Sequence, residues 1–152
     1  MAGWGSTLPA AIDALVATFT AMNLADVSVT DGPALTDVDT IGLLTVGYSA
    51  EGSDLAASAQ TASEGLGGGR NRESYDVYCS ASVLTGDEDQ KVTRDKALSM
   101  YSSACEAVHA DPTLGGVVMR ATPGDFTLHQ SATTRGRATT VQFAVSVDAY
   151  TA

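Results

Sequence analysis

The chain has 152 residues, a length that suits one domain rather than two. Its hydrophobic content of 44% excludes a largely disordered chain and can supply a core that needs no disulfide or metal. The 18 acidic residues outnumber the 8 Lys and Arg, and the formal net charge of −10 argues against a general nucleic-acid binder and against a protein held on anionic lipid.

Most of the net negative charge lies in the N-terminal half. Residues 1–69 contain eight acids and no Lys or Arg, whereas all eight basic residues lie between Arg70 and Arg137. The start of the chain has no basic segment, and polar residues interrupt the apolar stretch that follows, which does not match a secretory signal peptide. Since no apolar run is long enough to cross a bilayer, we expect a protein made in the cytoplasm with no membrane partner.

The first predicted element is a helix over residues 7–23. Ser6 or Thr7 can cap its N-terminus, and Pro9 suits the first turn, where no backbone N–H is needed. Apolar residues repeat at helical spacing and predict one buried face. These residues are Ile12, Leu15, Val16, Phe19 and Met22.

Two strands and a long loop are expected next. Residues 26–31 alternate in polarity and residues 41–48 form an apolar run, so both are predicted as strands. Residues 49–72 are rich in Gly, Ala and Ser and are predicted to form a long flexible loop, a kind of segment that is usually functional or disordered. The glycine-rich part of this loop contains Gly65, Gly67, Gly68 and Gly69.

The second half of the chain begins with a strand and a helix. Residues 73–83 alternate between polar and apolar, which is typical of a half-buried strand in an antiparallel sheet. The acidic turn 86–89 is expected to start a helix that ends before Asp111 and Pro112, with the acids at its positive end. The predicted inner stripe of this helix consists of Val92, Leu98, Tyr101, Cys105 and Val108.

Three further strands complete the predicted fold. A short strand is expected over residues 114–120, followed by a hairpin of strands 125–132 and 138–150. The whole pattern predicts a single α+β domain over residues 1–152, with a mostly antiparallel sheet, two helices packed on one face and a long Gly-rich loop.

The sequence lacks the motifs of common catalytic and metal sites. His109 and His129 have no nearby cysteine or second histidine, so no metal site is expected. The glycine run lacks the Lys-Ser/Thr of a phosphate loop, and no Gly-x-Ser-x-Gly nucleophile motif occurs. A glycosidase-like pair of carboxylates stays open, although a single Trp offers little for stacking sugars. We therefore expect no enzyme activity and no cofactor.

The two cysteines, Cys79 and Cys105, fall on the predicted inward faces of a strand and a helix. They can pair in one disulfide, but their positions favour buried free thiols. Buried neutral thiols are poor nucleophiles, so neither cysteine is expected to be catalytic.

Assembly with other subunits is the role that the remaining features favour. The glycine-rich loop can order against a neighbour. Four arginines in two predicted loop segments can face the acids of the next subunit in a self-associating ring, or can be ordinary solvated charges. These arginines are Arg70, Arg72, Arg135 and Arg137. Trp4 precedes the first helix and can anchor a partner or fold back onto the core.

The order of the segments along nearly the whole chain carries a family resemblance. In chain order the segments are Thr45-Val46-Gly47-Tyr48 at the end of a strand, Arg72-Glu73-Ser74-Tyr75-Asp76-Val77-Tyr78-Cys79 at the start of another, the acidic turn Gly86-Asp87, the helix end Asp111-Pro112-Thr113-Leu114-Gly115-Gly116-Val117-Val118, and the last strand from Gly136-Arg137-Ala138 to Asp148-Ala149-Tyr150. This pattern resembles the tail terminator proteins of long-tailed, siphovirus-like bacteriophages, particularly those that infect actinobacteria.

The resemblance implies a structural protein of the virion, located at the head–tail interface. Proteins of this kind form a hexameric ring at the head-proximal end of the tail tube, where the ring ends tube polymerisation. The implied partners are further copies of the chain, the tail tube protein and the head-to-tail connector or stopper protein. Genomic DNA would pass through the bore without specific binding, because an acidic lining neutralises no phosphate.

Two other interpretations stay open. The chain can be a head-completion or stopper protein, or a tail-tube subunit, of the same particle; a tube subunit should polymerise alone, and a stopper should bind the head portal. It can instead be a small-molecule or carbohydrate binding module, which needs a pocket with convergent polar groups. The tyrosines that would line such a pocket are Tyr75, Tyr78, Tyr101 and Tyr150.

Overall fold

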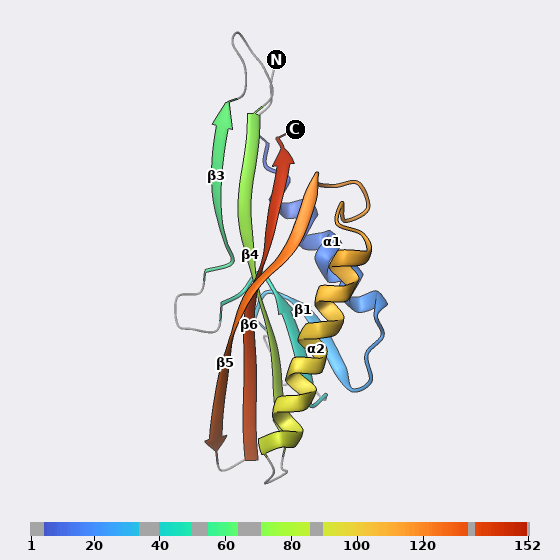
Figure 1. Cartoon of the computed structure of the whole chain (residues 1–152), viewed down its shortest axis with the longest axis vertical. Helices are drawn as coiled ribbons and strands as arrows, with labels where there is room; N and C mark the ends of the chain where they lie inside the picture. The colour runs from blue at the N-terminus through green and yellow to red at the C-terminus, as the bar shows by residue number, and fades with distance from the viewer. Residues whose placement is uncertain are drawn as a thin grey trace.

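The computed structural model describes residues 5–33, 40–49, 55–63, 71–85, 90–133 and 136–151. Within them the chain forms two helices and six strands: α1 (Leu8–Ala21), β1 (Val27–Asp31), β2 (Gly42–Val46), β3 (Ala57–Ser63), β4 (Asn71–Thr85), α2 (Gln90–Ala110), β5 (Arg120–Thr133) and β6 (Gly136–Tyr150). The strands form one sheet in the order β1-β2-β4-β6-β5, with β3 also paired to β4 (Figure 1). Of these pairings β1–β2 is parallel and the others are antiparallel, so the predicted α+β class with a mostly antiparallel sheet is confirmed.

The two longest strands, β4 and β6, run side by side along the whole length of the sheet. They are antiparallel over fourteen register pairs, from Arg72 opposite Tyr150 to Thr85 opposite Arg137. Because side chains alternate along a strand, one face of this pair is almost entirely apolar. The buried apolar residues of this face are Tyr75, Val77, Cys79, Ala81, Val83, Val141, Phe143, Val145, Val147 and Ala149.

Both helices cover this apolar face (Figure 1). The helix α1 lies against β1 and β2, and Thr7 at its start contacts Glu73 on the apolar side of β4. The helix α2 lies against β4, β6 and β5, and its Thr93 is hydrogen-bonded to Thr139 on the apolar side of β6 at 3.1 Å. The opposite face of the sheet carries the polar members of each alternating strand.

A buried carboxylate fixes the start of α1 on the sheet. Glu73 is only 2% exposed, and its Oε1 accepts hydrogen bonds from both the backbone N–H and the hydroxyl of Thr7 at 2.6 Å. Its Oε2 accepts a third bond from Ser6 Oγ at 2.9 Å. A negative group at this place stabilises the helix, because the N-terminal end carries the positive end of the helix dipole. Of the two expected caps, Thr7 is the N-cap residue, but its own side chain accepts no bond from the first turn. Instead Ser6 Oγ accepts from Leu8 N–H at 3.0 Å, and Glu73, 66 positions away, accepts from Thr7 N–H.

The stripe by which α2 contacts the sheet was predicted only in part. Val108 is buried as expected, but Val92 is 46% exposed, and Leu98, Tyr101 and Cys105 are only partly buried. The side chains that point at the sheet are instead small or flexible, which brings the helix axis close to the strands. They are Thr93, Ala97, Met100, Ala104 and Val108.

The short strand predicted over residues 114–120 is wrong, because the chain turns there. Asp111 Oδ1 accepts hydrogen bonds from the backbone N–H and hydroxyl of Thr113, and its Oδ2 accepts one from Gly115 N–H at 2.8 Å. Gly115 and Gly116 adopt φ angles of +75° and +89°, a region that glycine enters without steric strain. The next strand, β5, begins only at Arg120.

The long loop predicted over residues 49–72 is interrupted by a strand. Ala57–Ser63 forms β3 and pairs antiparallel with β4, whose first residues belong to the same predicted loop. The strands β2 and β3 lie one after the other along the same side of β4, and Tyr78 lies between the two paired stretches. The backbone of Tyr78 closes the gap, because its C=O accepts from Gly47 N–H and its N–H donates to Ala56 C=O.

Glu73→Ala is expected to lower the free energy of unfolding by about 2–3 kcal/mol, because it leaves the N–H and hydroxyl groups at the start of α1 without their charged acceptor. Glu73→Gln, which keeps one acceptor oxygen, should lose less. Urea denaturation followed by circular dichroism measures both changes. The matched control is Glu106→Ala, an exposed acid on α2, which should change stability by under about 0.5 kcal/mol. Equal effects of Glu73→Ala and Glu106→Ala would contradict this role.

Candidate functional site: open strand edges and a polar groove

Three strands have a neighbour on one side only within the part of the chain that the structure describes. The strand β5 borders the sheet on one side, β1 borders it on the other, and β3 borders the half of β4 that β2 does not reach. The unpaired backbone N–H and C=O groups of such an edge can bind another strand. These edges are therefore the first places to look for contacts with other chains.

The strand β5 is the longest of these edges and carries exposed apolar side chains. Phe126 and Leu128 lie two residues apart, so both point to the face that the helices cover. They are nevertheless 46% and 37% exposed, because α2 covers β5 only in part. An edge strand with large apolar side chains is a typical contact surface for another protein.

The shape of this edge depends on a β-bulge supported by α2. The register with β6 shifts between Pro123 and Phe126, and Pro123 has no N–H to offer a partner. Tyr101 of α2 donates its hydroxyl to the C=O of Gly124 at 3.2 Å, and its ring lies 4.8 Å from that of Phe126 and 5.1 Å from that of Phe143. The position of Phe126 at the edge is thus fixed by a cluster of three aromatic rings.

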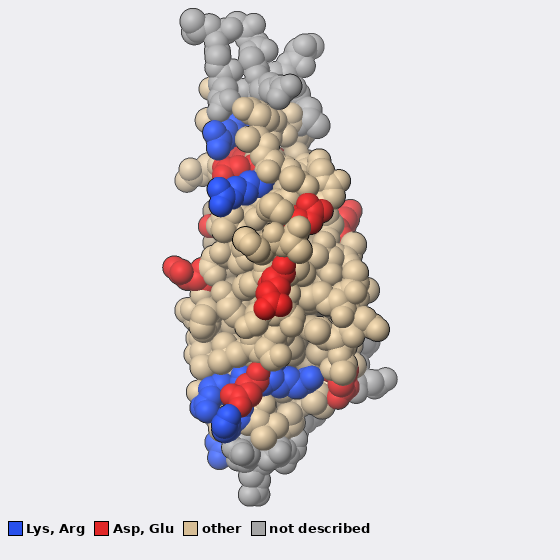
Figure 2. Space-filling view, turned by 45° about the vertical axis from the view of Figure 1, so that its right-hand side comes forward, with Lys and Arg blue, Asp and Glu red and all other residues tan. Residues whose placement is uncertain are grey.

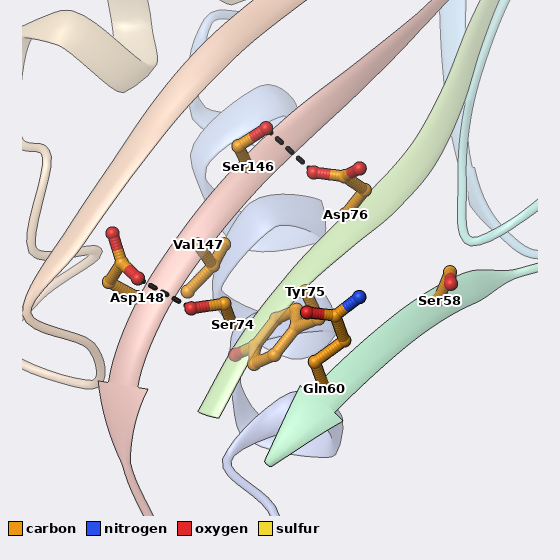
Figure 3. A pocket seen from close by; sticks show the side chains of 8 residues that line it. All are labelled: Ser58, Gln60, Ser74, Tyr75, Asp76, Ser146, Val147 and Asp148. Carbon is orange, nitrogen blue, oxygen red and sulfur yellow. Dashed lines mark hydrogen bonds between the residues drawn. The ribbon is translucent and has the colours of Figure 1, made fainter. Parts of the chain in front are cut away.

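A polar groove lies on the face of the sheet that the helices leave open. It has a volume of about 290 Å³ and is lined by residues of β3, β4 and β6 (Figure 3). Ser74 opposes Asp148 and Asp76 opposes Ser146 in the β4–β6 register. Each serine donates its hydroxyl to the opposing carboxylate at 2.7 Å, so two Ser–Asp pairs point in opposite directions across the two strands.

The groove therefore offers hydrogen-bond acceptors more than donors. Each carboxylate retains lone pairs after it accepts one serine hydroxyl, and these suit a donor-rich group such as a guanidinium. Arg72 Nη2 lies 3.5 Å from Asp148 Oδ1 at the end of the groove. Both side chains are more than 40% exposed, so this ion pair contributes under about 1 kcal/mol to stability.

The four arginines expected to act together do not form one cluster. Arg72 is in β4 opposite Tyr150, and Arg137 is in β6 opposite Thr85, so the two lie on strands at opposite ends of the β4–β6 pair. Figure 2 shows basic side chains gathered near the two ends of one face, with acidic side chains between them. Arg70 and Arg135 lie outside the described residues, as do the other predicted contact residues, Trp4, Gly65, Gly67, Gly68 and Gly69.

The sequence analysis did not single out the residues that form the β5 edge and the groove. Phe126 and Leu128 lie in a strand that was predicted as part of a hairpin, but the sequence does not show how much of that strand the helix α2 covers. Ser74 and Asp76 were recognised as the polar face of a strand. Their pairing with Asp148 and Ser146 depends on the register between strands about 70 residues apart.

The tyrosines proposed for a ligand pocket do not share one hollow. Tyr75 is buried on the helix side of the sheet, where its hydroxyl is hydrogen-bonded to Thr7 Oγ1 at 2.9 Å. Tyr78 lines a second hollow beside β5, and Tyr101 belongs to the aromatic cluster on the helix side. Within the described residues no group of three or more His, Cys, Asp and Glu is placed to hold a metal ion.

Comparisons with protein-family models and with curated proteins find no match to this chain. In the described part of the chain, neither helix combines the length and the apolar character needed to cross a membrane.

The two cysteines are free thiols, and Cys79 is expected to be unreactive in the folded protein. Cys79 is buried, and burial raises the pKa of its thiol to about 12. Burial also raises the pKa of Cys105, a half-buried thiol, although the neighbouring Tyr101 hydroxyl opposes this change. At pH 8 an aromatic disulfide reagent should therefore modify no more than one thiol per native chain, slowly, and both thiols in denaturant. Rapid modification of both thiols in the native protein would contradict the buried position of Cys79.

Proposed function

We propose that this chain is a structural subunit of a bacteriophage tail, which forms a ring at the head-proximal end of the tail tube. The ring ends tube polymerisation and joins the tail to the head connector. The observation that carries the proposal is the pair of different open edges, β5 and β3, on opposite sides of the β4–β6 pair. The resemblance of the segment order to tail terminator proteins supports the same conclusion.

Two different edges suit a ring because a head-to-tail contact joins one surface of a subunit to a different surface of the next. Such contacts close into a ring when the rotation between neighbours divides the circle evenly. The edge of β5 supplies backbone groups together with the exposed Phe126 and Leu128. The edge of β3 consists mostly of small residues that let another backbone approach, with Gln60 as the exception; its sequence is Ala57, Ser58, Ala59, Gln60, Thr61, Ala62 and Ser63.

The charges on the two sides of the subunit favour one orientation of this contact. The acceptor-rich groove lies beside β3, whereas Arg137 lies at the turn end of β6, next to β5. Opposite charges on the two sides of a subunit favour one order of contact over the reverse order. The net charge of −10 further suits a ring whose bore passes DNA, because a negative surface does not retain the phosphate backbone.

Termination itself needs two faces of the ring that differ. One face must present the same contact surface that a tube subunit presents to the neighbouring layer of the tube. The other face must lack the surface on which a further tube layer would form. The difference in affinity between these two contacts stops growth, and no chemical step is needed. The partners in this proposal are other copies of the chain, the tail tube protein and the head-to-tail connector or stopper protein.

Phe126→Asp is expected to abolish assembly because it places a charge in the apolar part of the β5 edge. Purified tube protein is polymerised with increasing amounts of the chain, and tube lengths are measured by electron microscopy. The wild-type chain should shorten the tubes and form a cap at one end, and Phe126→Asp should leave tube length unchanged. The matched control is Thr127→Asp on the same strand, whose side chain points to the other face and which should still cap the tubes.

Circular dichroism and thermal melting establish that each variant is folded, and Leu128→Asp repeats the test at a second exposed position. Long cylinders formed by the chain alone would identify a tube subunit instead. Binding to the head portal without any effect on tubes would identify a stopper. Capping by Phe126→Asp as effective as that by the wild type would exclude β5 as the subunit contact.

A further inference from the structure

A second contact surface lies at β1, the sheet edge on the far side from β5. The last turn of α1 runs beside this strand, and together they enclose a hollow of about 160 Å³. Four of its lining side chains are apolar, and they come from both elements; the full lining is Phe19, Thr20, Asn23, Leu24, Val27 and Val29. A volume of this size has room for one aliphatic or phenyl side chain, and the four apolar lining residues favour such a side chain over a polar one.

The strand β1 is held rigidly as a template for another strand. Its two ends are fastened to β2, because Gly42 N–H donates to Asp26 C=O at 3.1 Å and Gly32 N–H donates to Val46 C=O at 2.7 Å. On the face of β1 that points away from the helices, Ser28 Oγ is hydrogen-bonded to Thr40 Oγ1 at 2.8 Å. Within the described residues β1 pairs with β2 alone, so its other edge is open. A strand that is already ordered loses little entropy when it binds a partner.

An open strand edge beside a partly apolar hollow is the arrangement by which many proteins bind an extended peptide. The peptide adds a strand through backbone hydrogen bonds, and one of its side chains enters the hollow. The backbone contacts supply affinity without sequence preference. The choice of peptide then depends on the hollow and on the charges at the two ends of the strand.

The charges at β1 favour a basic peptide. Asp26 and Asp31 stand at the two ends of the strand, in a half of the chain where residues 1–69 contain eight acids and no Lys or Arg. One base from elsewhere, Lys96 of α2, approaches this edge and donates to Ala25 C=O at 3.1 Å. Its ammonium group lies at one end of β1, so the other end, at Asp31, is the more negative.

We infer that the open edge of β1 binds an extended segment of a partner protein, with an apolar side chain in the hollow and a basic residue at the Asp31 end. This contact uses neither β5 nor β3. It therefore stands whether or not the chain forms a ring, and it leaves the β1 edge available for a partner in the assembled state.

The probe is a blocked seven-residue peptide of sequence Lys-Thr-Val-Thr-Val-Thr-Lys, titrated into the full ¹⁵N-labelled chain and followed by nuclear magnetic resonance. We expect saturable shifts in the amides of Val27–Asp31 and of the last turn of α1. The matched peptide with Glu in place of both Lys residues should bind at least tenfold more weakly. Equal binding of the acidic peptide would overturn the proposed partner chemistry.

Thr20→Trp tests the hollow, because Thr20 is exposed on α1 and a large ring there fills the space. It should weaken binding of the basic peptide at least tenfold. The control Ala10→Trp, an exposed position near the start of the same helix, should bind as the wild type does. If Thr20→Trp does not fold, Thr20→Lys repeats the test by repelling the peptide. Shifts confined to β5 or β3, unchanged affinity in both Thr20 variants, or no binding at millimolar peptide would each overturn the inference. None of these outcomes affects the tube-capping experiment.

Discussion

The long antiparallel pair of β4 and β6 is the constraint on which the rest of the structure depends. Its fourteen register pairs place every other element: β2 and β3 follow one side of β4, β5 follows the outer side of β6, and both helices cover one face. A slip of one residue in this register would turn the whole apolar row of each strand to the opposite face. The hydrophobic pattern of both strands therefore specifies a single alignment.

This alignment also creates the surfaces on which the functional proposals depend. It brings Ser74 opposite Asp148 and Asp76 opposite Ser146, and so builds the polar groove from two strands that are distant in sequence. It also leaves β5 only partly covered by α2, so that Phe126 and Leu128 remain exposed on the apolar side of the sheet. Edge contacts and core packing are thus two consequences of the same pairing.

The sequence predicted best those elements whose side chains face two different environments. The strands β4 and β6 alternate along most of their length, and α1 has a regular apolar face, so all three were recognised with nearly correct limits. The strand β3 was missed because its small polar residues have low β propensity, and it exists through pairing with β4. Residues 114–120 were predicted as a short strand, whereas the hydrogen bonds of Asp111 and the glycines after it produce a turn.

The functional surfaces could be predicted from the sequence less well than the fold, for a physical reason. Whether an apolar residue of an edge strand is covered depends on how far across the sheet a distant helix lies, as the exposed Phe126 beside Tyr101 of α2 shows. The stripe of α2 was misjudged for a related cause: small residues such as Ala97 and Ala104 allow close packing, so the larger Leu98 and Tyr101 lie at the margin. Of the predicted contact residues, Arg72 and Arg137 are in the described strands, at opposite ends of the sheet.

The measurement that tests the central claim most directly is electron microscopy of lysates from a phage in which this gene is disabled, with the gene restored from a plasmid as the control. The proposed function predicts over-long or unjoined tails beside filled heads, and normal particles when the gene is restored. Tails of normal length beside leaking heads would contradict a role in ending the tube and would point to a stopper. Intact, infectious particles without the protein would contradict any role in tail assembly.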